Sequence, residues 1–471
     1  MRASVRRTLL VAACLILALV VALAALALAF RFNFHRPAPA AAYPTPASPL
    51  EAQRQDVDYF AKAIALDRSF TPAARTAAEA QLAGLEALPQ ALPAPRLHVA
   101  LMQVMALADN GHSRVGTLLD DSMILPLRVT RFAEGYYVTR AAPAYRDMLG
   151  GRVESIDGQP VEQVLRRLDT LHGGVAGFRR EADAIHLVVQ DLLYGLGIAA
   201  ARDASSWTVT LPDQRTVTHR VEAYARHKDE GIAAGGRWLS PEPGDGVERA
   251  WAVYHPQSGE LPQTWHQPDR AFRAFQADGS CAQVVQLRSI SDSGTQQIAP
   301  FLEATEAALR AAAPCAVILD LRGDGGGDYT NTWRFAHALP ELLAPGGRIF
   351  VLTDPATFSA AITTTAFVKQ AGGDRVAIIG EPVGDRLSFF SEGGQACLPN
   401  LGACAYYQTG KHDYAGPCDD WKQCFWLNRL YPVRVESLDP DVPVPLAFAD
   451  WNAGHDRAYE TALRLAAHPE R

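Results

Sequence analysis

Apolar residues recur at the spacing of a helix in the first part of the chain after residue 50. Between residues 51 and 110 they lie three or four positions apart in "EAQRQDVDYFAKAIAL", "TPAARTAAEAQLAGLEAL" and "PRLHVALMQVMALA",. The second stretch begins with Thr71 and Pro72, a capping residue followed by proline at the first helical position,. We therefore expect a helical N-terminal segment over residues 51–120.

The pattern changes to short strands between residues 121 and 225. "LPLRVTRF" and "GYYVTRA" predict two strands, and "RVESIDGQPVEQV" predicts a strand, a turn at Asp157-Gly158 and a helix after Pro160,. "WTVTL" and "TVTHRVEAY" predict a hairpin. The "ESIDGQPVEQV" stretch resembles the strand–turn–helix passage of PDZ domains, so the prediction is a PDZ-like domain; a generic small α/β module is the alternative.

The last segment, residues 226–471, contains fully apolar strands. Residues 228–275 are rich in Gly, Pro and Trp and predict no clear element. From residue 281, the strand-like runs "CAQVVQLRSI", "CAVILDL", "RIFVLT" and "RVAIIG" are separated by helical patterns. Uninterrupted apolar strands alternating with helices indicate a buried, mostly parallel sheet in an α/β domain.

The N-terminus carries the longest apolar run. Residues 9–30 contain no charge and are preceded by Arg2, Arg6 and Arg7. Such a run can cross a bilayer as a helix, and the arginines favour a cytoplasmic N-terminus with the rest exported. We expect a retained single-pass anchor in the inner (plasma) membrane, with the remainder in the periplasm or another extracytoplasmic space. A cleaved signal peptide is the alternative. The Pro- and Ala-rich residues 36–49 predict a stiff spacer that completes the segment 1–50.

The chain length and net charge limit the number of domains and the classes of function. The 471 residues suffice for two or three domains, and the net charge of -7 gives no sign of nucleic-acid binding,.

Four cysteines are clustered between residues 397 and 424. Cys397 with Cys404 and Cys418 with Cys424 is the simplest of three possible disulfide pairings,. A zinc site is the rival, but no CxxC spacing supports it. Outside this cluster, Cys281 and Cys315 each open a strand-like run, and bridged or free thiols are equally compatible with that position.

Two neighbouring strand ends carry candidate chemistry. "ILDLRGDGGGDY" leads a buried strand into a turn at residues 325–327, and glycine turns can aim backbone N–H groups at an anion,. Ser359 in "VLTDPATFSAA" follows the next strand and precedes a helix. Parallel strands bring their carboxyl ends to one edge, where a nucleophile would meet N–H donors. The alternative is that Ser359 simply caps the helix.

The order of four motifs resembles a known family. "LDLRGDGGG", "VLTDPATFSAA", "RVAIIGEPVGDR" and "DPDVPV" follow one another as in the tail-specific (C-terminal processing) and tricorn-type serine peptidases, the S41-like peptidases. "ALADNGHSRVG" resembles the helix end that precedes the family's peptidase core. The resemblance covers residues 280–465 well and 95–171 loosely. It implies a ClpP/crotonase-like β-β-α core with an inserted PDZ-like domain.

The resemblance implies a nucleophile and a base. It makes Ser359 the nucleophile, and the amides of Gly326 and Ala360 the oxyanion donors. One branch of the family activates its serine with a lysine, but this chain has Asp385 at that position. The tricorn-like branch uses a histidine that aligns with His112, so we expect His112 to be the general base.

The third member of the triad is less well defined. Glu436 lies near the place where tricorn-type enzymes carry a glutamate, and it is the first choice for the acid that orients the histidine,. Asp385 and Glu392 are alternatives. Asp324 stands where the family usually has asparagine, which bears on the shape of the glycine turn.

The expected function is a membrane-tethered serine endopeptidase. It would cleave peptide or unfolded protein substrates through an acyl-enzyme, without a metal or other cofactor. A catalytically silent peptide- or ligand-binding protein on the same fold is the main alternative. A crotonase-like enzyme acting on a thioester is a third, disfavoured because coenzyme A thioesters are not expected outside the cytoplasm.

Overall fold

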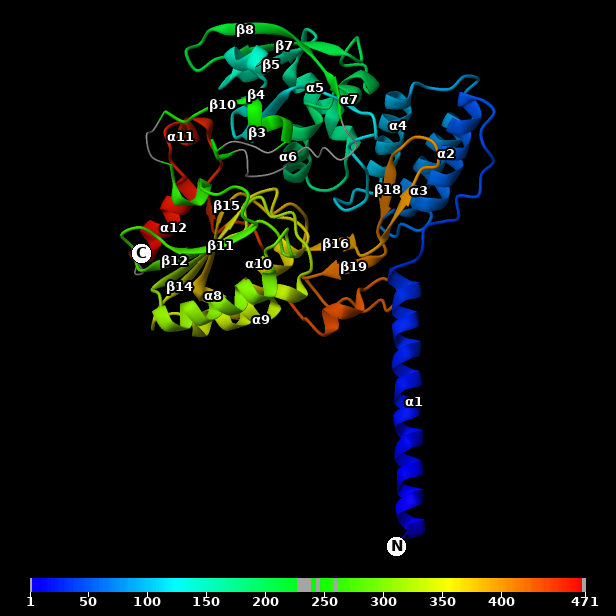
Figure 1. The fold of residues 1–471 in the computed structure, drawn as a ribbon, viewed down its shortest axis with the longest axis vertical. Helices are drawn as coiled ribbons and strands as arrows, with labels where there is room; N and C mark the ends of the chain where they lie inside the picture. The colour runs from blue at the N-terminus through cyan, green and yellow to red at the C-terminus, as the bar shows by residue number, and fades with distance from the viewer. Residues whose placement is uncertain (1, 227–238, 243–245, 258–260, 468–471) are drawn as a thin grey trace.

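The computed structural model describes residues 2–226, 239–242, 246–257 and 261–467 (Figure 1). A long helix, α1, projects away from the rest of the molecule. Three further helices follow where apolar spacing predicts them, and the Thr71 hydroxyl accepts a hydrogen bond from the Ala74 amide at 3.2 Å, as expected of a cap,. The bounds are α1 Arg2–Phe34, α2 Pro49–Ile64, α3 Pro72–Glu86 and α4 Ala94–Ala106.

A mostly antiparallel sheet forms the second part, at the top of Figure 1. Its order is β10-β4-β5-β7-β8, with β3 paired to β4 and β6 to β5. The expected helix follows β6 as α5, and the expected hairpin joins β7 to β8. The sequence did not predict α6 or α7; α6 lies between this sheet and the core, and α7 packs against α4. The bounds are β3 Leu127–Phe132, β4 Gly135–Ala141, β5 Arg152–Ile156, β6 Gln159–Pro160, α5 Val161–Leu168, α6 Ala176–His186, α7 Gln190–Gly195, β7 Ala204–Thr210, β8 Thr216–Glu222 and β10 Ala252–Val253.

The core is a six-stranded sheet in the order β11-β12-β13-β14-β15-β20. The strands from β12 to β20 run parallel and β11 is antiparallel, so the expectation of a mostly parallel sheet is confirmed. Helices α8, α9 and α10 cover one face and α12 the other. The bounds are β11 Phe272–Gln276, β12 Ala282–Leu287, α8 Ile298–Ala312, β13 Ala316–Asp320, α9 Thr330–Ala338, β14 Arg348–Thr353, α10 Ala360–Gly372, β15 Val376–Gly380, β20 Val442–Pro443 and α12 Arg457–Ala467.

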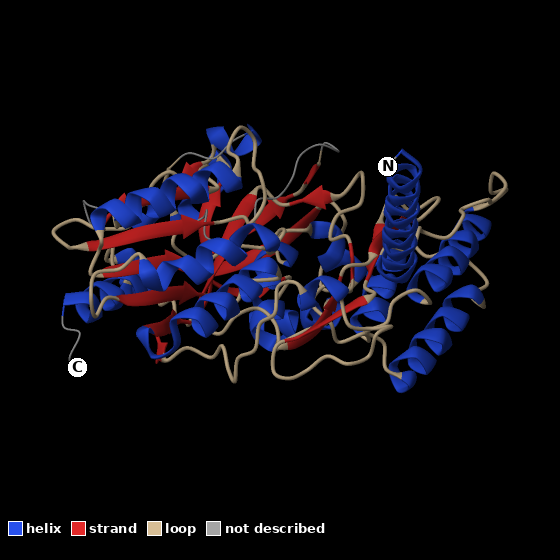
Figure 2. Cartoon of the chain, turned by 90° about the horizontal axis from the view of Figure 1, so that it is seen from below, coloured by secondary structure: helices blue, strands red, loops and turns tan. Residues whose placement is uncertain are grey.

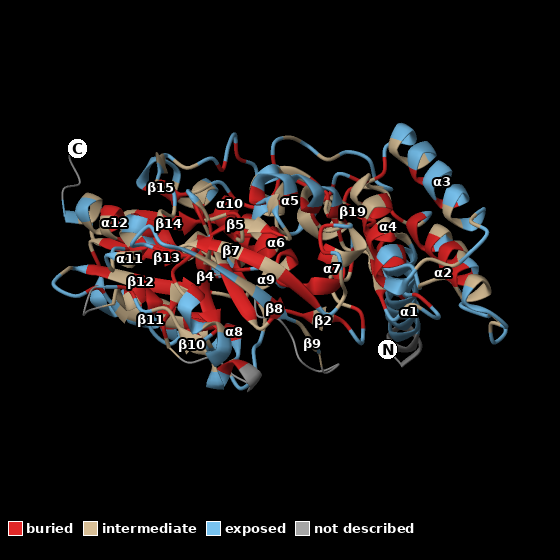
Figure 3. Cartoon of the chain, turned by 90° about the horizontal axis from the view of Figure 1, so that it is seen from above, coloured by how far each residue is buried: buried red, intermediate tan, exposed pale blue. Residues whose placement is uncertain are grey.

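Alternate residues of each core strand face opposite layers. On β14, Ile349 and Val351 pack with α10, whereas Phe350 and Leu352 pack with α12. Both faces are therefore covered, which explains why these strands are apolar throughout. Figure 3 shows them as a buried band between exposed helix surfaces.

Small hairpins connect the helical segment to the core. Strand β18 pairs with both β17 and β1, and β16 pairs with β19. Because β1 begins at Arg114, this pairing fixes the chain directly after His112. The bounds are β1 Arg114–Val115, β16 Ser388–Ser391, β17 Gly394–Cys397, β18 Cys404–Tyr407 and β19 Gly410–Asp413; outside them lie β2 Met123–Ile124, β9 Tyr224–Ala225 and α11 Phe448–Asn452.

Six cysteines form three disulfides. Cys397 is joined to Cys404 across the β17–β18 hairpin, and Cys418 to Cys424 in the following loop. Cys281 and Cys315, whose state the sequence left open, are joined at the starts of β12 and β13.

The apolar run near the N-terminus is the exposed part of α1. Over Leu9–Phe34 this helix is long and apolar enough to cross a membrane, and its side chains are exposed until its last turns. There the side chain of Phe34 is fully buried and packs against Phe425 and Trp426. Figure 2 views α1 along its axis, beside the folded part of the chain.

Candidate active site

Ser359 occupies a strained turn between β14 and α10. Its backbone has φ 53° and ψ -122°, a conformation that non-glycine residues rarely adopt,. Although Ser359 is at the N-cap position, its side chain makes no capping hydrogen bond. The residue is partly exposed and lines a cavity. These observations disfavour the interpretation of Ser359 as an ordinary capping serine.

The glycine turn after β13 lies against Ser359 because β13 and β14 are adjacent parallel strands. The Phe358 amide donates a hydrogen bond to the Asp324 carbonyl at 2.9 Å, which joins the two turns. A Cβ atom added to Gly326, which has φ +105°, would lie 2.6 Å from Cβ of Ser359. Only glycine permits this approach.

The backbone amides around Ser359 are not all free. The Gly326 N–H, one of the two expected oxyanion donors, donates to Oδ1 of Asp324 at 2.8 Å. The Ala360 N–H, the other expected donor, has no acceptor among the described residues, and neither has the Gly325 N–H. Gly325 also lines the cavity.

Asp324 is buried with an unpaired oxygen. Its side chain is inaccessible to solvent, and Oδ2 has no hydrogen-bond partner in the described structure. Burial raises the pKa of Asp324 well above its ordinary value of 3.8,. A neutral carboxyl has the shape of a carboxamide, which accounts for aspartic acid at a position where the family usually carries asparagine.

His112 is held between two aromatic rings. Its imidazole stacks on Phe358 with centroids 4.2 Å apart and on Phe389 at 5.2 Å. The Gln408 side chain donates to the His112 carbonyl at 2.8 Å. Both ring nitrogens are buried without a hydrogen-bond partner, so no hydrogen bond joins His112 to Ser359 in this structure. His112 and Ser359 nevertheless line the same cavity.

The carboxylate nearest to the imidazole belongs to Asp385. Its Oδ2 atom lies 3.7 Å from Nδ1 of His112, and its side chain is only 1% exposed. Burial lowers the pKa of His112 below 6.5, and the Asp385 carboxylate acts against that shift,. His112 is therefore neutral at pH 7, the state a general base requires.

The other candidate acids lie elsewhere. Glu436, the first choice from the sequence, is exposed; together with Asp385 it lines a cavity that His112 does not line. Glu392 lies 3.5 Å from Nε2 of His412. Lys369, the only lysine of α10, pairs its ammonium with Asp441 at 2.9 Å.

The cavity shared by Ser359 and His112 has a volume of about 600 Å³. Part of its lining comes from residues 172–186, a segment that includes α6 and in which no sequence motif or periodicity predicted a role. Phe178 stacks on Phe358 at 4.2 Å. His172 and His186 also line the cavity, and burial lowers the pKa of each to about 4. No pattern in the sequence singled out His172 or His186 as lining a site.

Comparison with known proteins shows a likeness of fold to solved structures. No family model matches the chain, and no curated protein matches it. Among solved structures, CPAF bound to lactacystin is 14% identical and has a TM-score of 0.57; the match covers 89% of this chain and 98% of CPAF. A serine-to-alanine mutant of CPAF is 13% identical with the same coverage and a TM-score of 0.59. The photosystem II D1 C-terminal processing protease is 15% identical over 86% of this chain and 98% of its own, at a TM-score of 0.37.

The match to CPAF supports an S41-like tail-specific peptidase fold for this chain. This confirms the family resemblance seen in the order of the motifs. In this S41-like fold the glycine turn and Ser359 lie at the carboxyl edge of the parallel sheet.

Proposed function

We propose that the protein is a serine endopeptidase that cleaves peptide or unfolded protein substrates. The observation that carries the proposal is the convergence of Ser359, His112 and the glycine turn on one cavity. We also assign residues 226–471 to a ClpP/crotonase-like peptidase core and residues 121–225 to a PDZ-like domain. An exposed strand edge of such a domain can bind an extended peptide by strand addition.

The proposed triad is Ser359, His112 and Asp385. Asp385 lies on the Nδ1 side of the imidazole, which leaves Nε2 to accept the serine proton. This choice replaces Glu436, since Asp385 is the carboxylate beside the ring. Asp385 would hold the imidazole in one orientation and stabilise the imidazolium as it forms.

The reaction follows from these positions. Ser359 Oγ attacks the substrate carbonyl carbon while its proton passes to Nε2 of His112, and the carbonyl oxygen becomes an oxyanion. The N–H groups of Ala360 and Gly325 stabilise that charge. His112 then donates the proton to the leaving amine as the C–N bond breaks. Water hydrolyses the acyl-enzyme by the same route, which releases the acid product and restores Ser359.

The proposed location is a membrane surface outside the cytoplasm. Three disulfides favour an oxidising compartment,. Burial of Phe34 against Phe425 makes the end of α1 part of the folded domain, which supports a retained anchor over a cleaved signal peptide.

The test uses the full chain in detergent, because the end of α1 belongs to the fold. We expect the wild-type protein to degrade casein, Ser359→Ala to be inactive, and Ser293→Ala, a change at an exposed loop serine, to remain active. Equal casein degradation by Ser359→Ala and wild type would refute the proposal.

A further inference from the structure

Two large apolar side chains are exposed outside α1. Within the described residues, every other exposed large hydrophobic side chain lies on α1 itself. The exceptions are Trp421, 51% exposed, and Leu430, 69% exposed. Both belong to one loop, residues 415–431. The Cys418–Cys424 disulfide lies within this loop, and the short helix η8, Trp426–Arg429, follows the disulfide. We call this loop the α1 lip.

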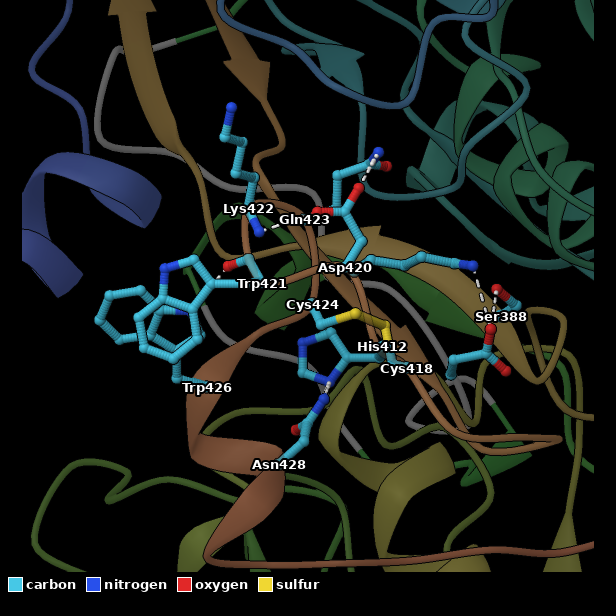
Figure 4. The surroundings of a disulfide bond; sticks show 12 residues. Ser388, His412, Cys418, Asp420, Trp421, Lys422, Gln423, Cys424, Trp426 and Asn428 are labelled. Atoms are coloured by element: carbon cyan, nitrogen blue, oxygen red, sulfur yellow. Dashed lines mark hydrogen bonds and ion pairs between the residues drawn. A yellow bond between two sulfur atoms is a disulfide. The ribbon is translucent and has the colours of Figure 1, made fainter.

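The α1 lip packs on the end of α1. The Trp426 ring lies 5.8 Å from Phe30 and 5.5 Å from Phe34, and Trp421 stacks on Trp426 at 3.9 Å. The Asn33 side chain donates to the Lys422 carbonyl at 3.0 Å. Figure 1 shows the loop beside the upper turns of α1, and Figure 4 shows Trp421 and Trp426 next to the disulfide.

The end of α1 is also held by two residues that precede the loop and by one within it. The Thr409 hydroxyl donates to the Phe34 carbonyl, and the Tyr407 hydroxyl donates to the Arg36 carbonyl. Phe425, within the loop, is buried against Phe34. If α1 crosses a bilayer, the loop must therefore lie at the level where α1 leaves it.

The α1 lip carries two exposed cationic side chains near its exposed tryptophan. Lys422 and Arg429 are exposed, and the Arg429 guanidinium lies 6.0 Å from the centre of the Trp421 ring. Asp419 and Asp420 are exposed as well, and Asp420 accepts the amide of Lys422 at 2.9 Å. Tryptophan next to cationic side chains is typical of protein at the headgroup level of a membrane.

We propose that the α1 lip is a membrane-contact surface that sits in the headgroup region of a bilayer. Trp421 and Leu430 reach the boundary of the acyl chains, and Lys422 and Arg429 pair with lipid phosphates. The proposal rests on the part of the proposed function in which α1 spans the membrane. Continuity of the lip with α1 favours lipid over a protein partner as the occupant.

The contact would also fix how the catalytic cavity is presented to the membrane. Asn428 of the lip lies 3.2 Å from Nδ1 of His412, and His412 stacks on Phe389 at 5.1 Å. Phe389 in turn stacks on His112. The membrane-contact surface and the proposed base are thus parts of one packed unit, so the cavity stays at a set height above the bilayer.

The experiment measures depth with a spin label on the full chain in lipid nanodiscs of phosphatidylcholine and phosphatidylglycerol. Cys14, the free cysteine of the described chain, is changed to alanine, and the label is attached at Leu430→Cys or, as control, at Asp213→Cys on the β7–β8 turn. We expect the label at position 430 to collide more with oxygen than with a water-soluble nickel complex, and the label at 213 to do the reverse. Equal exposure of both labels to the nickel complex would overturn the proposal.

A second measurement introduces no cysteine. Lipids brominated near the headgroup should quench tryptophan fluorescence more strongly in the wild-type protein than in Trp421→Phe, and equal quenching would contradict the contact. The double change Lys422→Glu and Arg429→Glu should raise nickel access at position 430, because these side chains then no longer pair with lipid phosphates. Unchanged nickel access would overturn that pairing. These readouts do not depend on peptidase activity, so a catalytically inactive protein would still report them.

Discussion

The Nδ1 atom of His112 lies 3.7 Å from the Oδ2 atom of Asp385, and both atoms are closed to solvent. In such a space an ion pair is weakly screened, so the carboxylate can stabilise a positive charge on the imidazole while the serine proton is held there. Neither atom has another hydrogen-bond partner. A small movement of the ring would bring them into contact.

Replacing that carboxylate tests the third member of the triad. We expect Asp385→Asn to lower kcat/KM on a peptide substrate by roughly 10²–10⁴-fold, because the imidazole loses its orientation and its counter-charge. Glu436→Gln is the matched control and should retain wild-type kinetics, since Glu436 is exposed, whereas the Asp385 carboxylate is buried beside the imidazole. The reverse order of effects would reassign the acid to Glu436.

The pH profile tests the state of His112. Burial lowers its pKa, and only the neutral imidazole accepts a proton, so kcat/KM should fall on the acid side, with a midpoint below pH 6.5. Asp385 opposes the effect of burial, and Asp385→Asn should therefore move this midpoint to lower pH. Rates measured from pH 4 to 9 decide the question. A midpoint above 6.5, or a shift toward higher pH in the variant, would contradict this account.

The approach of the glycine turn to Ser359 predicts a sharp steric effect. A methyl group at Gly326 would meet Cβ of Ser359 at 2.6 Å. Gly326→Ala should thus lower kcat by roughly 100-fold or more through displacement of the nucleophile. Gly294→Ala is the control, because Gly294 also has a positive φ but faces open space. Similar losses in both variants would point to backbone strain instead of displacement.

The buried carboxyl of Asp324 predicts a pH-dependent gain in stability. Its folded pKa is raised above the unfolded value, so the folded state binds the proton more tightly and stability is lost as pH rises above about 4. Asp324→Asn removes this loss. Its melting midpoint should match wild type near pH 4 and exceed it at pH 8, by about 2–4 °C for each kcal/mol gained. A gain that is equal at both pH values would argue against a titrating Asp324.

The packing of the last turn of α1 predicts that a substitution there lowers the stability of the folded domain. Phe34→Ala should cost about 3–5 kcal/mol of unfolding free energy, because Phe34 is buried against Phe425. Activity should fall as well, since Phe425 packs on His412 and, through Phe389, behind His112. Phe32→Ala, at a position 63% exposed, is the control. Denaturant unfolding in detergent compares the two variants, and equal stability would contradict the packing argument.

The parallel sheet could be predicted because its strands are buried on both faces. Runs such as residues 316–320 are apolar at every position but the last, and a helix follows each,. Ser359 was recognisable because it follows one of these strands and precedes a helix, next to a strand that leads into a glycine turn. Local sequence patterns were therefore enough to predict the parallel sheet and to identify Ser359 as the candidate nucleophile.

The contact between His112 and Asp385 could not be derived in this way. It joins the end of the helical segment to the loop after β15, and no periodicity relates the two. Position along the chain favoured Glu436, which lies on the surface. The sequence did not predict helix α6 for a related reason. Phe178 and His186 of this helix line the cavity, so its apolar and aromatic residues do not all face the core and give no simple helical period.

The most direct measurement locates a covalent adduct on the nucleophile. The full chain is treated with a fluorophosphonate, digested, and the modified peptide is identified by mass spectrometry. The account predicts a single adduct on Ser359, a large loss of its rate of formation in His112→Ala, and no adduct in Ser359→Ala. A modified serine at another position, or an adduct on Ser359 that forms equally fast without His112, would contradict the central claim.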